Sequence, residues 1–196
     1  MDNITYLKSQ KKQKITLNDY ISAYYDSEIL EVTQDMIGFL SHIAEQTIIK
    51  NGEMEYHGRI NEYGNFIENV MVNAIKTYYG DDVIIEMLGT GYPDLRLIIG
   101  EKIIYPELKI SSNIDDVKSG FRVFYTSTPE EKTKLRKNIQ DGYHILFHFE
   151  HSGPGQLTGR YKVTDLCNFE YMSHGNIQQG SYYDIYSKHD KIILRG

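Results

Sequence analysis

The sequence has only one cysteine, Cys167, among its 196 residues, which excludes an intrachain disulfide framework and favours a cytoplasmic setting. No apolar run approaches the roughly 18 residues that a membrane-spanning helix needs, so we expect no membrane partner. The start, MDNITYLKSQKKQK, lacks the apolar centre of a signal peptide. No Cys/His spacing indicates a zinc site, and we interpret His144, His148 and His151 as core or rim residues of an apolar strand.

Positive charge is also scarce. The net charge is −6, which argues against a general nucleic-acid coat protein. Residues 1–16 carry four lysines against one aspartate, a charge of +3, whereas residues 17–68 carry ten acids against two bases, a charge of −8. Residues 69–196 are nearly balanced, with sixteen acids and fifteen bases. A charged substrate responds to the local field more than to the net charge, so the near-neutral part is the candidate binding region.

Hydrophobic periodicity predicts three helices, over residues 18–29, 33–52 and 59–79, before any strand. Thr128-Pro129-Glu130-Glu131 then signals a helix running to about Gln140. A strand, this helix and a further strand indicate a parallel crossover. Predicted strands cover residues 83–88, 94–99, 103–110, 143–150 and 159–163.

The stretch GYPDLRLIIGEKIIYPELKIS, residues 91–111, reads as a hairpin with charges at two points in an apolar pattern. A turn at residues 100–102 gives cross-strand partners whose numbers sum to 201, which places Asp94 opposite Glu107. Like charges so placed destabilise a sheet, but a divalent cation between them reverses the sign. Pro106 cannot donate to a strand ladder, so either a bulge lies there or the register is wrong by one residue.

Pro93-Asp94, twelve intervening residues and Glu107-Leu108-Lys109 resemble the motif of the PD-(D/E)xK nuclease superfamily, which includes many type II restriction endonucleases. Both halves match without substitution. Gly64 to Glu68 is similar to the Gly-x-x-x-Glu that many members carry on the helix before the core sheet. The resemblance covers roughly residues 60–163. The alternative is a set of ordinary solvated charges on an amphipathic hairpin.

The resemblance implies an α/β fold with a restriction-endonuclease-like core, a mixed central sheet flanked by helices, here with extra N-terminal helices. It implies that Asp94 and Glu107 hold Mg²⁺, which Mn²⁺ can replace, with the Leu108 carbonyl as a further ligand. Lys109 would orient the attacking water and offset charge on the phosphate. Glu68 would complete the catalytic set through a water or a second ion, and Glu62, in the same predicted helix, is the alternative upstream acid.

Candidate DNA contacts follow the motif. We interpret Lys118 and Arg122 as phosphate contacts, because they come soon after the site in the chain. Asn176, Gln178 and Gln179 have side chains that can bond adenine bidentately in the major groove. Such residues are equally common in plain loops, and both interpretations remain open.

We therefore expect a Mg²⁺-dependent endodeoxyribonuclease acting on double-stranded DNA, most simply a site-specific type II restriction enzyme. The alternatives are a repair or junction nuclease of the same superfamily and a non-catalytic DNA-binding module. One domain is expected, with a basic arm (1–16), a helical N-terminal subregion (17–58), the catalytic core (59–165) and a C-terminal segment for DNA or dimer contacts (166–196).

Cutting a palindromic site needs two active sites, which favours a twofold homodimer. The predicted second helix carries an apolar stripe that must be buried, either on its own core or against a twin chain. The homodimer hypothesis assigns it in part to the twin chain. The stripe consists of Ile37, Leu40, Ile43, Ala44 and Ile48.

Overall fold

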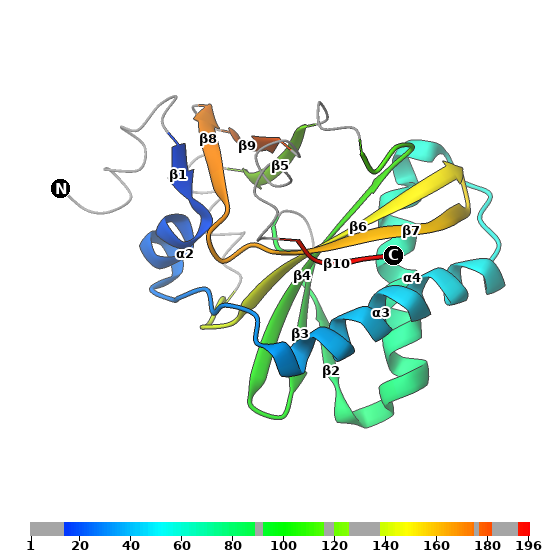
Figure 1. Cartoon of the computed structure of the whole chain (residues 1–196), viewed down its shortest axis with the longest axis horizontal. Helices are drawn as coiled ribbons and strands as arrows, with labels where there is room; N and C mark the ends of the chain where they lie inside the picture. Colours follow the sequence, from blue (N-terminus) through cyan, green and yellow to red (C-terminus); the bar gives the residue numbers. More distant parts are fainter. Residues whose placement is uncertain (1–13, 89–91, 116–119, 126–137, 175–176, 182–191) are drawn as a thin grey trace.

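The computed structural model describes residues 14–88, 92–115, 120–125, 138–174, 177–181 and 192–196. Two sheets organise them, and helices α3 and α4 lie at the opposite end of the molecule from α2 and the smaller sheet (Figure 1). The predicted helix from Thr128 lies mainly outside the described residues, and 138–140 adopt no regular element.

Helix α2 (Leu17–Tyr25) begins one residue before its predicted range and has Thr16 as its N-cap. Thr16 and Asp19 form a reciprocal capping box, with Asp19 N donating to Thr16 Oγ1 at 3.0 Å. Asn18, the first residue of the predicted range, lies within the helix, and its side chain accepts a hydrogen bond from the backbone N–H of Ile29 at 2.9 Å. The prediction of a helix through residue 29 is therefore wrong, because the chain turns at Asp26, whose φ is 53°.

Helix α3 (Gln34–Glu53) and helix α4 (Tyr63–Tyr79) pack on each other. A 3₁₀ turn, η1 (Ile60–Glu62), leads into α4, and a second, η2 (Gly80–Asp82), follows it. Gly80 ends α4 with φ +52°, a conformation that favours glycine. The two long helices thus lie close to their predicted ranges.

The apolar stripe of α3 is used within the chain. Leu40, Ile43 and Ala44 are buried in the larger apolar core, and Ile48 packs against it. The hypothesis that this stripe contacts a twin chain is therefore wrong for these three residues. A variant with aspartate in place of Leu40 and Ile43 would bury two charges in the core and disrupt the fold. Its oligomeric state would therefore not test the homodimer hypothesis.

The larger sheet has the strand order β10-β7-β6-β4-β3-β2. Among the strands that the structure describes in this sheet, β4 and β6 pair in parallel and the other neighbours pair antiparallel. The sheet is therefore mixed, and the motif-bearing strand β4 is central. In chain order, the first five strands of this sheet lie close to their predicted ranges, whereas the last strand, β10, was not predicted. The strands are β2 (Ile84–Met87), β3 (Leu95–Ile99), β4 (Lys102–Ser111), β6 (Tyr143–Gly153), β7 (Gln156–Asp165) and β10 (Ile192–Arg195).

The smaller sheet has the order β1-β8-β9-β5 and was not predicted. Its first strand, β1, consists of the last residues of the proposed basic arm, so Lys14–Thr16 are paired sheet residues. The rest of the arm, 1–13, lies outside the described residues. The strands are β1 (Lys14–Thr16), β5 (Gly120–Tyr125), β8 (Glu170–His174) and β9 (Ile177–Ser181).

Successive side chains of β4 point to opposite faces of the larger sheet. Ile104 and Leu108 join the apolar core formed with α3 and α4. Tyr105, which alternates with them, joins a second core with α2 and Leu146 of β6. Glu107 and Lys109 have the parity of Tyr105, so they lie on the face turned away from α3 and α4.

Candidate active site

The register of the β3–β4 hairpin decides whether the two candidate carboxylates meet. The observed partners are Leu97 with Ile104, Ile98 with Ile103 and Ile99 with Lys102. Each pair sums to 201, which confirms the predicted register. Asp94 lies immediately before β3, and its Oδ2 accepts a hydrogen bond from the backbone N–H of Leu108 at 2.8 Å.

Pro106 fits this register without a bulge. The ladder between β3 and β4 ends at Ile104, and β4 pairs with β6 without a register shift from Ile104 to Ser111. The N–H of Leu108 points toward Asp94, on the β3 side. The direction of the N–H groups along a strand repeats every two residues, so an N–H at position 106 would also point toward β3. The backbone of β3 no longer pairs with β4 at that point, so the proline interrupts no hydrogen bond of the ladder. Both predicted explanations, a bulge and a wrong register, are therefore wrong.

Glu107 is a buried carboxyl, with 2% of its surface exposed. Its pKa is raised from 4.5 to about 8, chiefly by burial; the Lys109 ammonium opposes this shift, and the neighbouring Asp94 adds to it. Burial outweighs the attraction of the lysine, so the carboxyl is largely protonated near neutral pH. Its Oε2 atom has no hydrogen-bond partner within the part of the chain that the structure describes.

Lys109 lies two residues further along the same face. Its Nζ donates a hydrogen bond to Glu107 Oε1 and another to the Leu108 carbonyl, the latter at 3.0 Å. These acceptors are two of the three metal ligands that the motif implies. The lysine ammonium therefore already occupies the position of a cation among them.

The chemistry of this donor set fits a hard divalent cation. Asp94 and Glu107 offer carboxylate oxygens and Leu108 offers a carbonyl. Glu107 Oε2 is a buried acceptor without a partner among the described residues. Across the described ranges, no group of three or more His, Cys, Asp or Glu side chains is placed to bind a metal ion. Mg²⁺ suits so sparse a set, because it is commonly held by one or two carboxylates and keeps several waters.

The upstream acid remains a prediction. Glu68 lies half-buried on α4, and Glu62 is exposed in η1 before that helix. The apolar side of α4 packs on the sheet face that carries Leu108, opposite to the face of Glu107.

Sequence reasoning missed two side chains beside the site. Lys109, His148 and Lys162 occupy matched positions on β4, β6 and β7, so they form a row on one sheet face. His148 is fully buried, and its Nε2 lies 2.8 Å from Ser111 Oγ. Burial, then the positive charges of Lys162 and Lys109, lower the pKa of His148 to about 3, so this ring is neutral.

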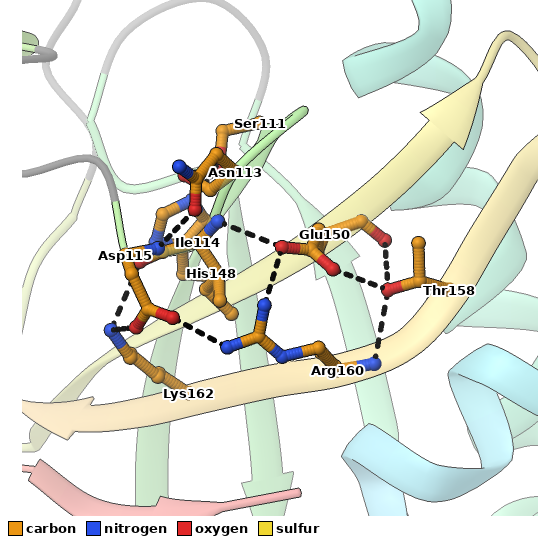
Figure 2. A network of polar contacts seen from close by, with 9 residues as sticks. All are labelled: Ser111, Asn113, Ile114, Asp115, His148, Glu150, Thr158, Arg160 and Lys162. Carbon is orange, nitrogen blue, oxygen red and sulfur yellow. Dashed lines mark hydrogen bonds and ion pairs between the residues drawn. The ribbon is translucent and has the colours of Figure 1, made fainter.

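The end of this row belongs to a network of charges around Asp115 (Figure 2). Lys162, only 6% exposed, donates to Asp115 Oδ1 and to the Ile114 carbonyl, both at 2.9 Å. Arg160 bridges Asp115 at 2.5 Å and Glu150 at 2.8 Å. The segment that leaves β4 is thus fastened to β6 and β7. The sequence feature that could have predicted part of this network is the alternation of polar residues in HILFHFE, which places His148 and Glu150 on one face of the strand.

The structure places three of the five predicted DNA contacts in the smaller sheet. Arg122 lies on β5, and Gln178 and Gln179 lie on the neighbouring strand β9. Arg122 and Gln179 are register partners. The other two, Lys118 and Asn176, lie outside the described residues.

The model of the type II restriction enzyme MjaV family matches residues 8–189. The chain belongs to this family. A search of curated proteins finds no match. In the described part of the chain, no helix is long and apolar enough to cross a membrane. As a member of the MjaV family, the chain is a restriction endonuclease with an α/β fold.

Proposed function

We propose that this restriction endonuclease hydrolyses phosphodiester bonds at specific sites in double-stranded DNA, with Mg²⁺ and a PD-(D/E)xK-type site. The observation that carries the proposal is the meeting of Asp94, Glu107 and Lys109 around a buried carboxylate oxygen that has no partner among the described residues. A buried carboxyl with a raised pKa beside a lysine costs stability, and such groups cluster at functional sites.

The roles follow from the contacts. Asp94, Glu107 and the Leu108 carbonyl would hold the cation. When bound, Mg²⁺ supplies charge neutralisation and lowers the pKa of water. The Lys109 ammonium bonds two of these groups, Glu107 and the Leu108 carbonyl, so it would have to leave them when they hold a cation. In that position the ammonium would orient the attacking water and offset charge on the phosphate.

Incubating the protein with phage DNA tests both the function and the metal. With Mg²⁺ or Mn²⁺ we expect discrete bands on a gel, because a site-specific enzyme cuts at few positions. Ca²⁺ is larger and takes more ligands, so it should support binding without efficient cleavage. EDTA should abolish cleavage.

The other outcomes separate the alternatives. A smear would indicate a nonspecific nuclease, and intact DNA that is nevertheless retained in a filter-binding assay would indicate a binding module. Unchanged cleavage in EDTA would contradict the metal proposal while leaving nuclease activity in place.

We also propose that the active enzyme is a homodimer, because two strands of a palindromic site require two matched active sites. Since Leu40, Ile43 and Ala44 are buried in the intrachain core, these three residues are not part of the interface. Sedimentation equilibrium at micromolar concentration should give twice the monomer mass of 22.8 kDa. A monomer in the absence and in the presence of uncut DNA with Ca²⁺ would contradict the proposal.

A further inference from the structure

A buried tyrosine–histidine pair lies next to the proposed metal site. Tyr92, two residues before Asp94, stacks on His144 of β6 with ring centroids 5.6 Å apart and an interplanar angle of 18°. The Tyr92 hydroxyl and His144 Nδ1 are 2.6 Å apart. His144 is fully buried, and Tyr92 is nearly so. The short segment that carries Asp94 is therefore bonded to a strand on the far side of β4.

His144 is itself held in a fixed place. It is the register partner of Tyr105 on β4, and their ring centroids are 4.7 Å apart. Burial lowers the pKa of His144 to about 3, so the imidazole is neutral and its link to Tyr92 is an ordinary hydrogen bond. Its Nε2 has no partner among the described residues, which leaves the Tyr92 hydroxyl as the polar contact that the structure assigns to this ring.

Asp94 needs such support because regular pairing does not reach it from β4. The β3–β4 ladder ends at Leu97, three residues after Asp94. On the β2 side, the Asp94 carbonyl accepts a hydrogen bond from Leu88 N–H at 3.0 Å. On the β4 side, the carboxylate itself makes the link, to Leu108 N–H. The Tyr92–His144 bond is a further contact, and it ties the residues just before Asp94 to β6.

We propose that His144 is a positioning residue, which holds the Asp94 carboxylate at the metal site through Tyr92. This inference rests on the proposed metal-dependent function. The role is one of orientation: His144 touches neither Asp94 nor Glu107 in any contact that the structure assigns. Groups that orient metal ligands typically change metal affinity by about 10–100-fold when they are removed.

The test measures Mn²⁺ binding by electron paramagnetic resonance, without DNA. His144→Phe keeps a ring of similar size and removes the ring nitrogen that bonds Tyr92, so Mn²⁺ should bind at least about tenfold more weakly. Tyr92→Phe removes the other end of the same bond and should weaken binding similarly. Because both variants break one bond, the double variant should be little weaker than either single one. In His144→Asn, Oδ1 takes the place of Nδ1 and should restore part of the affinity.

The matched control is His151→Phe, the same substitution on the same strand. His151 contacts Tyr63 of α4, on the other face of the sheet, with ring centroids 6.0 Å apart. The His151→Phe protein should bind Mn²⁺ as the wild type does. Circular dichroism establishes that each variant is folded, and if His144→Phe unfolds, Tyr92→Phe decides alone.

Folded His144→Phe and Tyr92→Phe proteins with wild-type Mn²⁺ affinity would overturn the inference. So would effects of the two substitutions that simply add. A failure of the proposed function looks different: Asp94→Ala would then bind Mn²⁺ as well as the wild type, or the wild type would not bind it. Weaker binding by His144→Phe, Tyr92→Phe and Asp94→Ala, with His151→Phe unchanged, supports both.

Discussion

Replacing Asp94 or Lys109 with alanine is expected to slow DNA cleavage by about a thousandfold or more, because metal-assisted charge stabilisation contributes several kcal/mol to such reactions. Asp94→Ala removes a carboxylate from the proposed cation site. Lys109→Ala removes the ammonium that bonds Glu107 and the Leu108 carbonyl. DNA binding, measured by gel shift in Ca²⁺, should be largely retained. Single-turnover cleavage of a plasmid in Mg²⁺ gives the rate.

Two further variants separate chemistry from folding. Asp94 also accepts the Leu108 N–H, so Asp94→Asn, which keeps an acceptor oxygen, should be as inactive as Asp94→Ala but more stable. The matched controls are Asp81→Ala in η2 and Lys76→Ala in α4, both at exposed positions away from the site. Full cleavage by folded Asp94→Asn or Lys109→Ala would show that the active site lies elsewhere.

Glu107→Gln is expected to abolish cleavage and to stabilise the metal-free protein at high pH. The pKa of Glu107 is raised from 4.5 to about 8 by burial. The folded state therefore holds this proton more tightly than the unfolded state. Stability from this group is complete below pH 4.5, falls as the pH rises toward 8, and is constant above that.

Glutamine does not titrate, so the stability difference between Glu107→Gln and the wild type should grow between pH 4.5 and 8. A shift of this size corresponds to a few kcal/mol, since one pKa unit is about 1.4 kcal/mol. Urea unfolding in EDTA at pH 5 and pH 9 measures the change. Glu101→Gln, at an exposed turn, is the control and should show no such growth. Parallel pH dependences for Glu107→Gln and the wild type would contradict the buried, protonated carboxyl.

The core of the site could be predicted from the sequence because it is local. Asp94, Glu107 and Lys109 lie on one hairpin, where turn position and the two-residue period fix which side chains meet. The strands β4 and β6 could likewise be predicted from the sequence, because they are rich in apolar residues. Nothing in this reasoning needed contacts between distant parts of the chain.

The rest depended on such contacts. The smaller sheet pairs Lys14 with Met172, residues at opposite ends of the chain, and strands such as IQQGS carry no alternation that would predict them. His148 and Lys162 look like an ordinary core histidine and a surface lysine until the β6–β7 register aligns them. Tyr92 and His144 likewise come together only through the order of the strands. The apolar stripe of α3 correctly predicted which face of the helix is buried. It did not predict whether the chain's own core or a twin chain covers that face.

The network around Asp115 changes how the enzyme should respond to salt. Arg160 and Lys162 lie near the site, yet they are bonded to Asp115 and Glu150, so the four charges cancel. Cations that neutralise phosphates release counterions from DNA, and each one steepens the loss of affinity with added salt. Arg160 and Lys162 would have to give up their carboxylates first, so they should add little to that slope. The counterion release of this enzyme should instead come from cations outside the network, with Arg122 of β5 the first candidate.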